Sequence, residues 1–255
     1  MVKVFLVGCV LLCLVVPVLC SAQSGARADL QGLLSAFVSY TDLRVRSVQQ
    51  SLKILASTKE VGSGDWQTMK DLLAGYEKSG EGLIVWFVLP DGAYYTVDKG
   101  LMNVKLSDRD YFPDLMAGRE ITGALVVSKS TGQRSSVIAV PVKQGGKVTG
   151  AVGASLFLDV LADDIGSFLA LRPDEGFFAL APSGLTTLHS KTDRHFLDPR
   201  ELGSDSLKKA ANEMLSTASG EVTYQYEGVT KTASYRTSPL TGWKFAITSS
   251  NVERQ

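Results

Sequence analysis

Arg109 carries the clearest chemistry in the sequence, within the string Ser-Asp-Arg-Asp-Tyr-Phe. A guanidinium can bind a carboxylate through two parallel hydrogen bonds, and it stays charged at any relevant pH. Tyr111 and Phe112 beside it can wall a pocket, and Tyr111 adds a hydroxyl. The alternative is an ion pair of Arg109 with Asp108 or Asp110 at the start of a helix. The string therefore predicts a carboxylate-binding site, unless Arg109 pairs only with one of these neighbouring aspartates.

Two further groups of residues are candidates to line the same pocket. Tyr94 and Tyr95 are neighbours on a predicted strand, and only one of them can face the pocket because side chains alternate along a strand. The alternation leaves open which one it is. Ser128, Lys129 and Ser130 end another predicted strand and would offer hydroxyls and a positive charge from the facing side. Each of these residues could instead be an ordinary core or strand-end residue.

Patterns for other chemistry are weak. The two histidines, His189 and His195, do not have the helical spacing of metal ligands, which favours a surface loop. Ser155 stands outside any Gly-x-Ser-x-Gly frame. The chain carries 26 basic and 26 acidic side chains, and this neutrality argues against nucleic-acid binding. We therefore predict no catalytic site, no metal site and no cofactor.

The first 22 residues have the pattern of a secretory signal peptide with cleavage after Ala22. Lys3 provides the positive start, and an apolar run from Val4 to Leu19 follows. One alternative is an uncleaved membrane anchor, although the run is short for a span of about 20 residues. Another is lipidation of Cys9 or Cys20. Since all three cysteines lie here, the exported chain would have neither disulfides nor thiolate metal sites.

The elements that must position the candidate residues begin with a long helix. Apolar residues recur at helical spacing from Arg27 to Ser57, which predicts one amphipathic helix of about thirty residues. A short helix follows, with Asp65 near its start. Strands separated by turn residues come next, with short helices predicted at 109–116 and 159–171. The predicted strands are residues 83–89, 93–97, 123–130, 135–142 and 148–158.

The same pattern then recurs in the second half of the chain. The turn Pro-Asp-Gly at 90–92 has a counterpart in Pro-Ser-Gly at 182–184, each between two short strands. A helix follows at 204–215, and three strands close the copy. We therefore predict two diverged copies of one α+β unit carried on the long helix. The strands of the second copy are residues 177–181, 185–188, 220–226, 230–237 and 243–248.

Taken together, these features resemble the double Cache sensor domains. The resemblance rests most on residues 106–112, 127–132 and 150–159, and on the matching second unit up to about residue 250. It implies an extracytoplasmic ligand-binding domain of the kind found in chemoreceptors, histidine kinases and cyclic-dinucleotide enzymes. The implied fold is α+β, with two PAS-like antiparallel sheets on a long N-terminal helix. The predicted division is 1–22 signal peptide, 23–60 helix, 61–172 first module, 173–250 second module and 251–255 tail.

The resemblance also bears on the ligand, which this family usually holds in the first module. Amino-acid-binding members resemble this sequence but carry a tryptophan where Tyr111 stands and an aspartate near the position of Ser155. Without that carboxylate, a buried ligand ammonium would lack its partner. We therefore expect a small organic acid held by Arg109, with Ser155 at the pocket.

The resemblance leaves the partners open. Such domains are usually followed by a second transmembrane helix and an output domain, which this sequence lacks. We therefore expect a stand-alone periplasmic or extracellular protein that acts through a membrane receptor or kinase. The alternative is a structural protein without ligand, whose long helix pairs with another chain. Ala36, Leu43 and Ile54 near a second helix face would permit such a homodimer.

Overall fold

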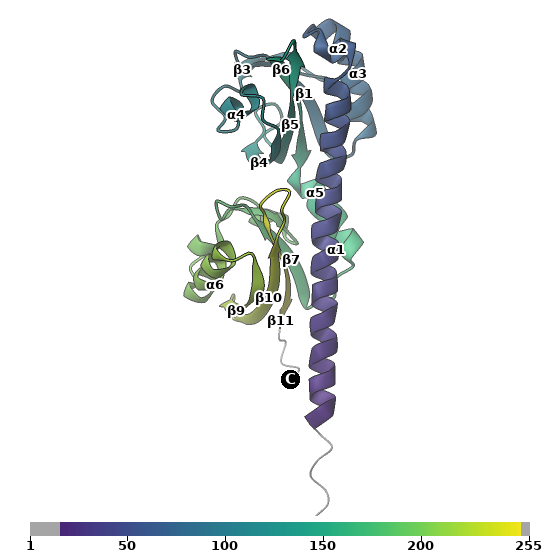
Figure 1. The fold of residues 1–255 in the computed structure, drawn as a ribbon. Helices are drawn as coiled ribbons and strands as arrows, with labels where there is room; N and C mark the ends of the chain where they lie inside the picture. The colour runs from purple at the N-terminus through teal and green to yellow at the C-terminus, as the bar shows by residue number, and fades with distance from the viewer. Residues whose placement is uncertain (1–15, 251–255) are drawn as a thin grey trace, which may run out of the picture.

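A long helix, α1 (Val16–Ala56), runs beside the whole length of the molecule (Figure 1). The computed structural model describes residues 16–250, with side chains described from residue 29 onwards. The helix begins before the predicted Arg27 and ends next to the predicted Ser57. Residues 1–15 and 251–255 lie outside the described residues, and with them most of the predicted signal peptide and all of the predicted tail.

Two shorter helices follow α1 and fold back beside it. These are α2 (Lys59–Gly62) and α3 (Trp66–Ser79). The Asp65 carboxylate caps α3 by accepting a hydrogen bond from the backbone N–H of Gln67, at 3.2 Å. Gly64, between the two helices, has a φ of +73°, which suits glycine because it has no Cβ. The segment between α1 and the predicted helix at Asp65 therefore contains one short helix, α2, that was not predicted.

The first sheet is antiparallel and has six strands in the order β3-β2-β1-β6-β5-β4. β3 was not predicted from the sequence, where residues 98–108 have no alternating pattern. It is an edge strand, and its mostly exposed side chains explain why no apolar signal marks it. The strands are β1 (Leu83–Val88), β2 (Ala93–Thr96), β3 (Gly100–Lys105), β4 (Ile121–Val127), β5 (Arg134–Gln144) and β6 (Lys147–Phe157).

The second sheet is antiparallel with five strands in the order β8-β7-β11-β10-β9. This order repeats that of β2-β1-β6-β5-β4, so the two halves share one topology, as the sequence repeat predicts. The strands are β7 (Glu175–Leu180), β8 (Thr186–His189), β9 (Ser219–Tyr226), β10 (Val229–Thr237) and β11 (Lys244–Ser250). The remaining helices are α4 (Phe112–Met116), α5 (Leu158–Leu169), η1 (Thr192–Arg194), η2 (Pro199–Glu201) and α6 (Asp205–Ser216).

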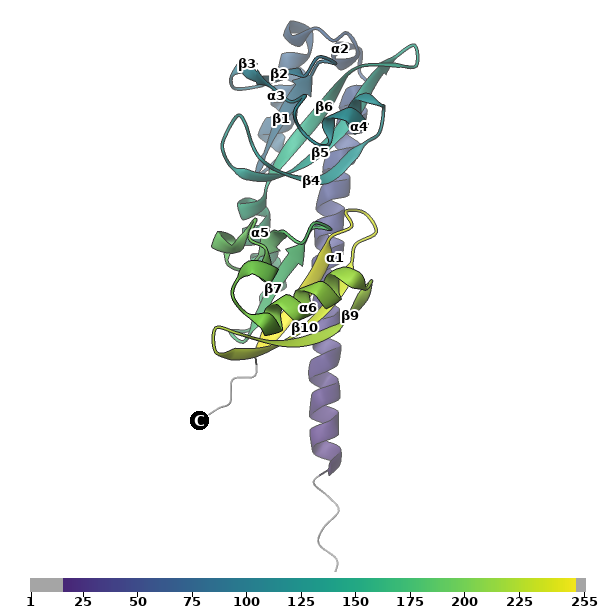
Figure 2. The same cartoon turned by 90° about the vertical axis from the view of Figure 1, so that its left-hand side faces the viewer.

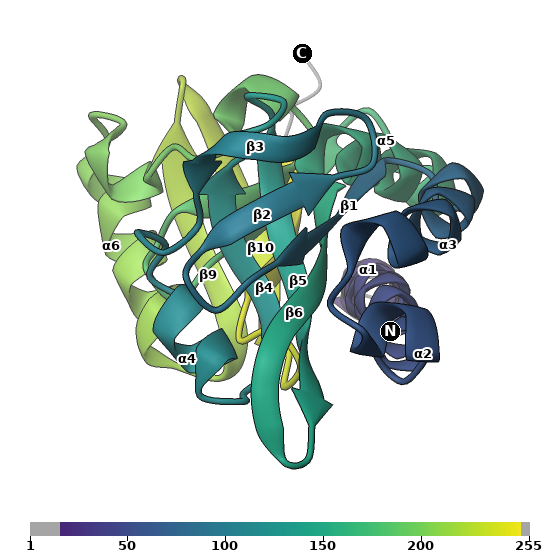
Figure 3. The ribbon, with the colours of Figure 1, turned by 90° about the horizontal axis from the view of Figure 1, so that it is seen from above.

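Each sheet is covered by helices on both faces. α1 packs against both sheets on one side, while α4 and α6 cover the opposite faces (Figures 2 and 3). Phe37 of α1 is fully buried and makes edge-to-face contacts with Phe177 of β7 and Phe245 of β11, at centroid distances of 5.0 and 4.8 Å. One continuous core therefore joins α1 to both sheets, and two smaller cores lie under α4 and α6.

Candidate ligand-binding site

A cavity opens in the first sheet on the face that carries α4. Side chains from β1, β2, β4, β5 and β6 meet there with the loop that precedes α4. Its volume is about 270 Å³, open mouth included. We call it the Arg109 cavity. Its lining residues are Trp86, Tyr94, Leu106, Arg109, Tyr111, Val126, Ser128, Lys129, Ser130, Val137 and Ser155.

Arg109 is held in place by its backbone and by one arm of its guanidinium. Its backbone N–H donates to the carbonyl of Leu106 at 3.0 Å, and Nη2 donates to the carbonyl of Val127 at 2.7 Å. Nε is buried and has no partner among the described residues. Arg109 makes no ion pair with Asp108 or Asp110, both of which the structure describes. The arrangement leaves a charged donor buried in the cavity and unsatisfied.

Two tyrosines stand close to this arginine. The hydroxyl of Tyr94 is buried and has no hydrogen-bond partner in the described part of the chain. Burial raises the pKa of Tyr94 above its ordinary value, although the charge of Arg109 opposes the rise. Burial also raises the pKa of Tyr111, again against the effect of Arg109. Both phenols therefore remain protonated and can donate hydrogen bonds at neutral pH.

The serine and lysine at the end of β4 lie on another wall. The hydroxyls of Ser128 and Ser130 are 3.1 Å apart and hydrogen-bonded to each other. Lys129 donates to the carbonyl of Lys105 at 2.6 Å and pairs with the Asp108 carboxylate at 2.5 Å. Lys129 is thus already partnered, which leaves Arg109 as the cavity's free cationic donor among the residues that line it.

Trp86 is a lining residue that the sequence did not indicate. Its indole N–H donates to the Ser155 hydroxyl at 3.1 Å. The ring lies over Gly153, its partner across β1 and β6, and a methyl group at Gly153 would collide with it. Only the register of β1 against β6 brings these residues together. A tryptophan within a buried strand gives no such signal by itself.

Two of the predicted residues lie elsewhere. Tyr95 points to the opposite face of the sheet and stacks on Trp66 of α3, with ring centroids 5.0 Å apart. Tyr94 is therefore the member of the pair that lines the cavity. Phe112 begins α4 and is buried in the small core beneath it, together with Leu115.

The two histidines form a structural contact. Nδ1 of His195 lies 2.7 Å from the Asp159 carboxylate, and its Nε2 accepts a hydrogen bond from the backbone N–H of His189 at 3.2 Å. His195 is fully buried, in contrast to the surface loop predicted for this segment. Among the described side chains, residues 29–250, no group of three or more His, Cys, Asp or Glu could hold a metal ion.

Residues 21–253 match the family model dCache_1, described as a Cache domain. The chain belongs to the double Cache family. This agrees with the long helix and the two repeated sheets. No curated protein sequence gives a significant match. In the described residues, no helix is long and apolar enough to cross a membrane.

Solved structures of other double Cache domains have the same fold. The extracellular domain of the histidine kinase candidate rpHK1S-Z16 matches with a TM-score of 0.75 and 17% identity, covering 90% of this chain and 96% of that one. The ligand-binding domain of PctB from Pseudomonas aeruginosa, solved with L-Arg, matches with a TM-score of 0.67 and 17% identity over 89% and 94% of the two chains. The sensory domain of Tlp3 from Campylobacter jejuni, solved with isoleucine, matches with a TM-score of 0.64 and 14% identity over 91% and 95%.

Proposed function

We propose that this double Cache protein is an exported sensor module that binds a small organic acid in the Arg109 cavity. One observation carries the proposal. Nε of Arg109 and the hydroxyl of Tyr94 are both buried, both without a partner among the described residues, and both line one cavity. A buried polar group without a partner costs free energy that a matching ligand would recover. A carboxylate offers only acceptors and is suited to both donors.

The charge of the lining favours a simple acid over an amino acid. The residues that line the cavity include Arg109 and Lys129 but no aspartate or glutamate, and the nearby Asp108 carboxylate is already paired with Lys129. Ser155 accepts the Trp86 N–H and offers no negative charge for an ammonium group. Isoleucine and L-Arg are the ligands in the Tlp3 and PctB structures, so the proposed specificity differs from theirs.

Calorimetric titration of the purified chain with acetate, propionate and succinate, and with isoleucine and arginine, tests this proposal. We expect at least one of the acids to bind, and Arg109→Ala to weaken that binding by about tenfold or more, because a charge-assisted hydrogen-bond pair is lost. Arg119→Ala is the matched control, since Arg119 pairs with Asp114 on the surface. Tight binding of an amino acid, or acid binding that survives Arg109→Ala, would contradict the proposal.

The proposal also includes the cellular location of the protein. We place the protein in the periplasm or outside the cell, where its occupancy would be reported to a membrane receptor or kinase. The support is that the extracellular domain of rpHK1S-Z16 and chemoreceptor domains share its fold. Cell fractionation with N-terminal sequencing tests the location, and a chain that begins at Gln23 is the expected product.

A second candidate function has an observation of its own. Leu43 and Ile54 are 68% and 67% exposed although both are large and apolar. They lie eleven residues apart on α1, close to three helical turns, so they share one side of the helix. This stripe supports the alternative that α1 pairs with a second copy of the chain.

A further inference from the structure

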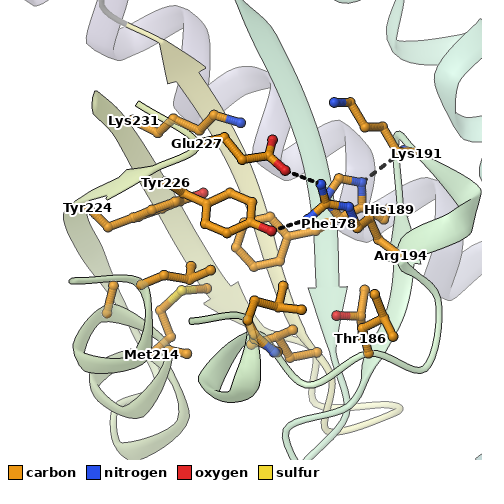
Figure 4. A pocket seen from close by; sticks show the side chains of 17 residues that line it. Phe178, Thr186, His189, Lys191, Arg194, Met214, Tyr224, Tyr226, Glu227 and Lys231 are labelled. Atoms are coloured by element: carbon orange, nitrogen blue, oxygen red, sulfur yellow. Dashed lines mark hydrogen bonds and ion pairs between the residues drawn. The ribbon is translucent and has the colours of Figure 1, made fainter. Parts of the chain in front are cut away.

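A larger cavity lies in the second half of the molecule, between α6 and the face of the second sheet opposite α1 (Figure 4). Its volume is about 680 Å³, open solvent included, which exceeds the 270 Å³ of the Arg109 cavity. We call it the α6 cavity. Strands β7, β8, β9 and β10 contribute to its walls, together with η1 and the segment that leads to α6. No motif in the sequence marks this place.

One end of the α6 cavity is apolar. Leu207, Ala210 and Met214 are buried side chains of α6 that face it, and Phe178 and Leu180 come from β7. Alanines on the helix leave space where larger side chains would fill the core. The apolar end could therefore accept a hydrocarbon chain or ring, and each buried methylene would contribute about 0.8 kcal/mol.

The other end is polar and carries an excess of positive charge. Lys191, Arg194 and Lys231 stand there with a single carboxylate, Glu227 (Figure 4). Glu227 is paired with Arg194 at 2.6 Å, and Arg194 also donates to the Tyr226 hydroxyl at 2.6 Å. The Lys231 ammonium has no close ion pair with a described carboxylate, and the charge of Glu227 acts on it only from a greater distance. This end of the cavity therefore has a net positive charge, which a bound anion would neutralise.

Neutral donors stand beside these cations. Nδ1 of His189 accepts a hydrogen bond from the backbone N–H of Lys191 at 2.8 Å, so the neutral ring carries its proton on Nε2. Burial lowers the pKa of His189 to about 3, helped by the charge of Arg194, by the neighbouring His195 and by the charges of Lys231 and Lys191, and this keeps the ring neutral. Tyr224 is buried and lines the cavity, and burial raises its pKa to about 12, so its hydroxyl stays protonated. The His189 and Tyr224 groups are thus further donors for a bound acceptor.

We propose that the α6 cavity is a second ligand site, which takes an amphipathic anion with one acidic head and an apolar tail. The head lies among Lys231, Lys191 and the donors of His189 and Tyr224, and the tail lies against α6. The proposal does not depend on the Arg109 cavity, because the two sites lie in different sheets and share no lining residue. It differs from the proposed function in ligand class, since the tail distinguishes this ligand from a short acid.

Octanoate is the probe, with octanamide as its neutral analogue and acetate as an acid without a tail. We expect octanoate to bind the Arg109→Ala variant, in which acetate has lost its proposed site, at least about tenfold more tightly than octanamide or acetate, since octanamide lacks the charge and acetate the apolar area. Lys231→Met should weaken octanoate binding about fivefold or more. Lys208→Met is the matched control, because Lys208 is exposed on the outer side of α6.

A second measurement locates the bound probe. Octanoate should shift the carbon-13 methyl signal of Met214, assigned through Met214→Leu, and leave that of the buried Met69 unchanged. Arg109→Ala should leave both the affinity and the Met214 shift unaltered. The proposal is overturned by absence of binding, by equal binding of octanamide, by an unmoved Met214 signal, by unchanged affinity in Lys231→Met, or by loss of octanoate binding in Arg109→Ala.

Discussion

At the scale of single residues, the two cavities differ in which cationic group is available to a ligand. In the Arg109 cavity the guanidinium is fixed by the Val127 carbonyl, and one buried N–H group remains without a partner among the described residues. In the α6 cavity Arg194 is hydrogen-bonded to Glu227 and Tyr226, and the Lys231 ammonium has no close ion pair among the described residues. A fixed guanidinium suits a small planar carboxylate, while a lysine suits a head whose position is set by its tail.

His189 gives a residue-scale prediction for the dependence of stability on pH. Its folded pKa, about 3, lies below the ordinary value near 6.5, so below about pH 6.5 the unfolded chain binds a proton that the folded chain does not. We expect this group alone to lower the free energy of unfolding by about 1–2 kcal/mol between pH 6.5 and 5. The loss should continue as the pH falls towards the folded pKa.

The measurement is urea unfolding of the chain and of His189→Gln at several pH values from 7 to 5. Carboxylates contribute to both proteins alike, so the difference between the two slopes isolates the histidine. The variant should lose less stability than the parent as the pH falls. Equal slopes would show that His189 takes up its proton freely in the folded chain.

At the scale of elements, α1 has two faces with different roles. Its buried face joins both sheets, and its outer face carries the exposed Leu43 and Ile54. Exposed leucine or isoleucine is common singly, but two on one side of a long helix can form the seam of a helix pair.

The pairing of α1 can be tested by replacing this stripe with charge. If α1 pairs with a second copy, the parent sediments as a dimer, and the double variant Leu43→Lys with Ile54→Lys sediments as a monomer. The control is Gln31→Lys, an exposed position on another side of the helix. A parent chain that stays monomeric up to high concentration excludes this use of α1 and leaves ligand binding as the function to test.

At the scale of the whole molecule, the second sheet depends on the same helix as the first. Phe37 packs between Phe177 and Phe245, while residues further along α1, such as Val48 and Leu52, belong to the same core beside the first sheet. Asp42 of α1 also accepts a hydrogen bond from Ser238 at 2.7 Å. Neither sheet can lose α1 without exposing this shared core.

We therefore expect the chain to unfold in a single cooperative transition. Phe37→Ala should lower the free energy of unfolding by about 3–5 kcal/mol, as is typical of a buried phenylalanine. Its whole transition should move, measured both by circular dichroism and by tryptophan fluorescence. Two separate transitions, or a shift confined to one probe, would contradict the idea of one shared core.

Much of the fold followed from local patterns in the sequence. Helical spacing gave the course of α1 after Arg27, and the two Pro-x-Gly turns revealed the repeat, because these signals depend only on neighbouring residues. β3 escaped prediction, since an exposed edge strand needs no apolar pattern. The start of α1 at Val16 also differed from the prediction.

The sequence by itself determined the family, and it singled out Arg109 as the candidate to bind an acid, because motifs carry that information along the chain. Only the tertiary structure decided that Tyr94 and not Tyr95 lines the cavity, and that Trp86 meets Ser155. Strand register sets both of these contacts, and it joins residues far apart in the sequence. The α6 cavity likewise exists only once helix and sheet are packed, because the space left between side chains is a property of their packing and of no single segment.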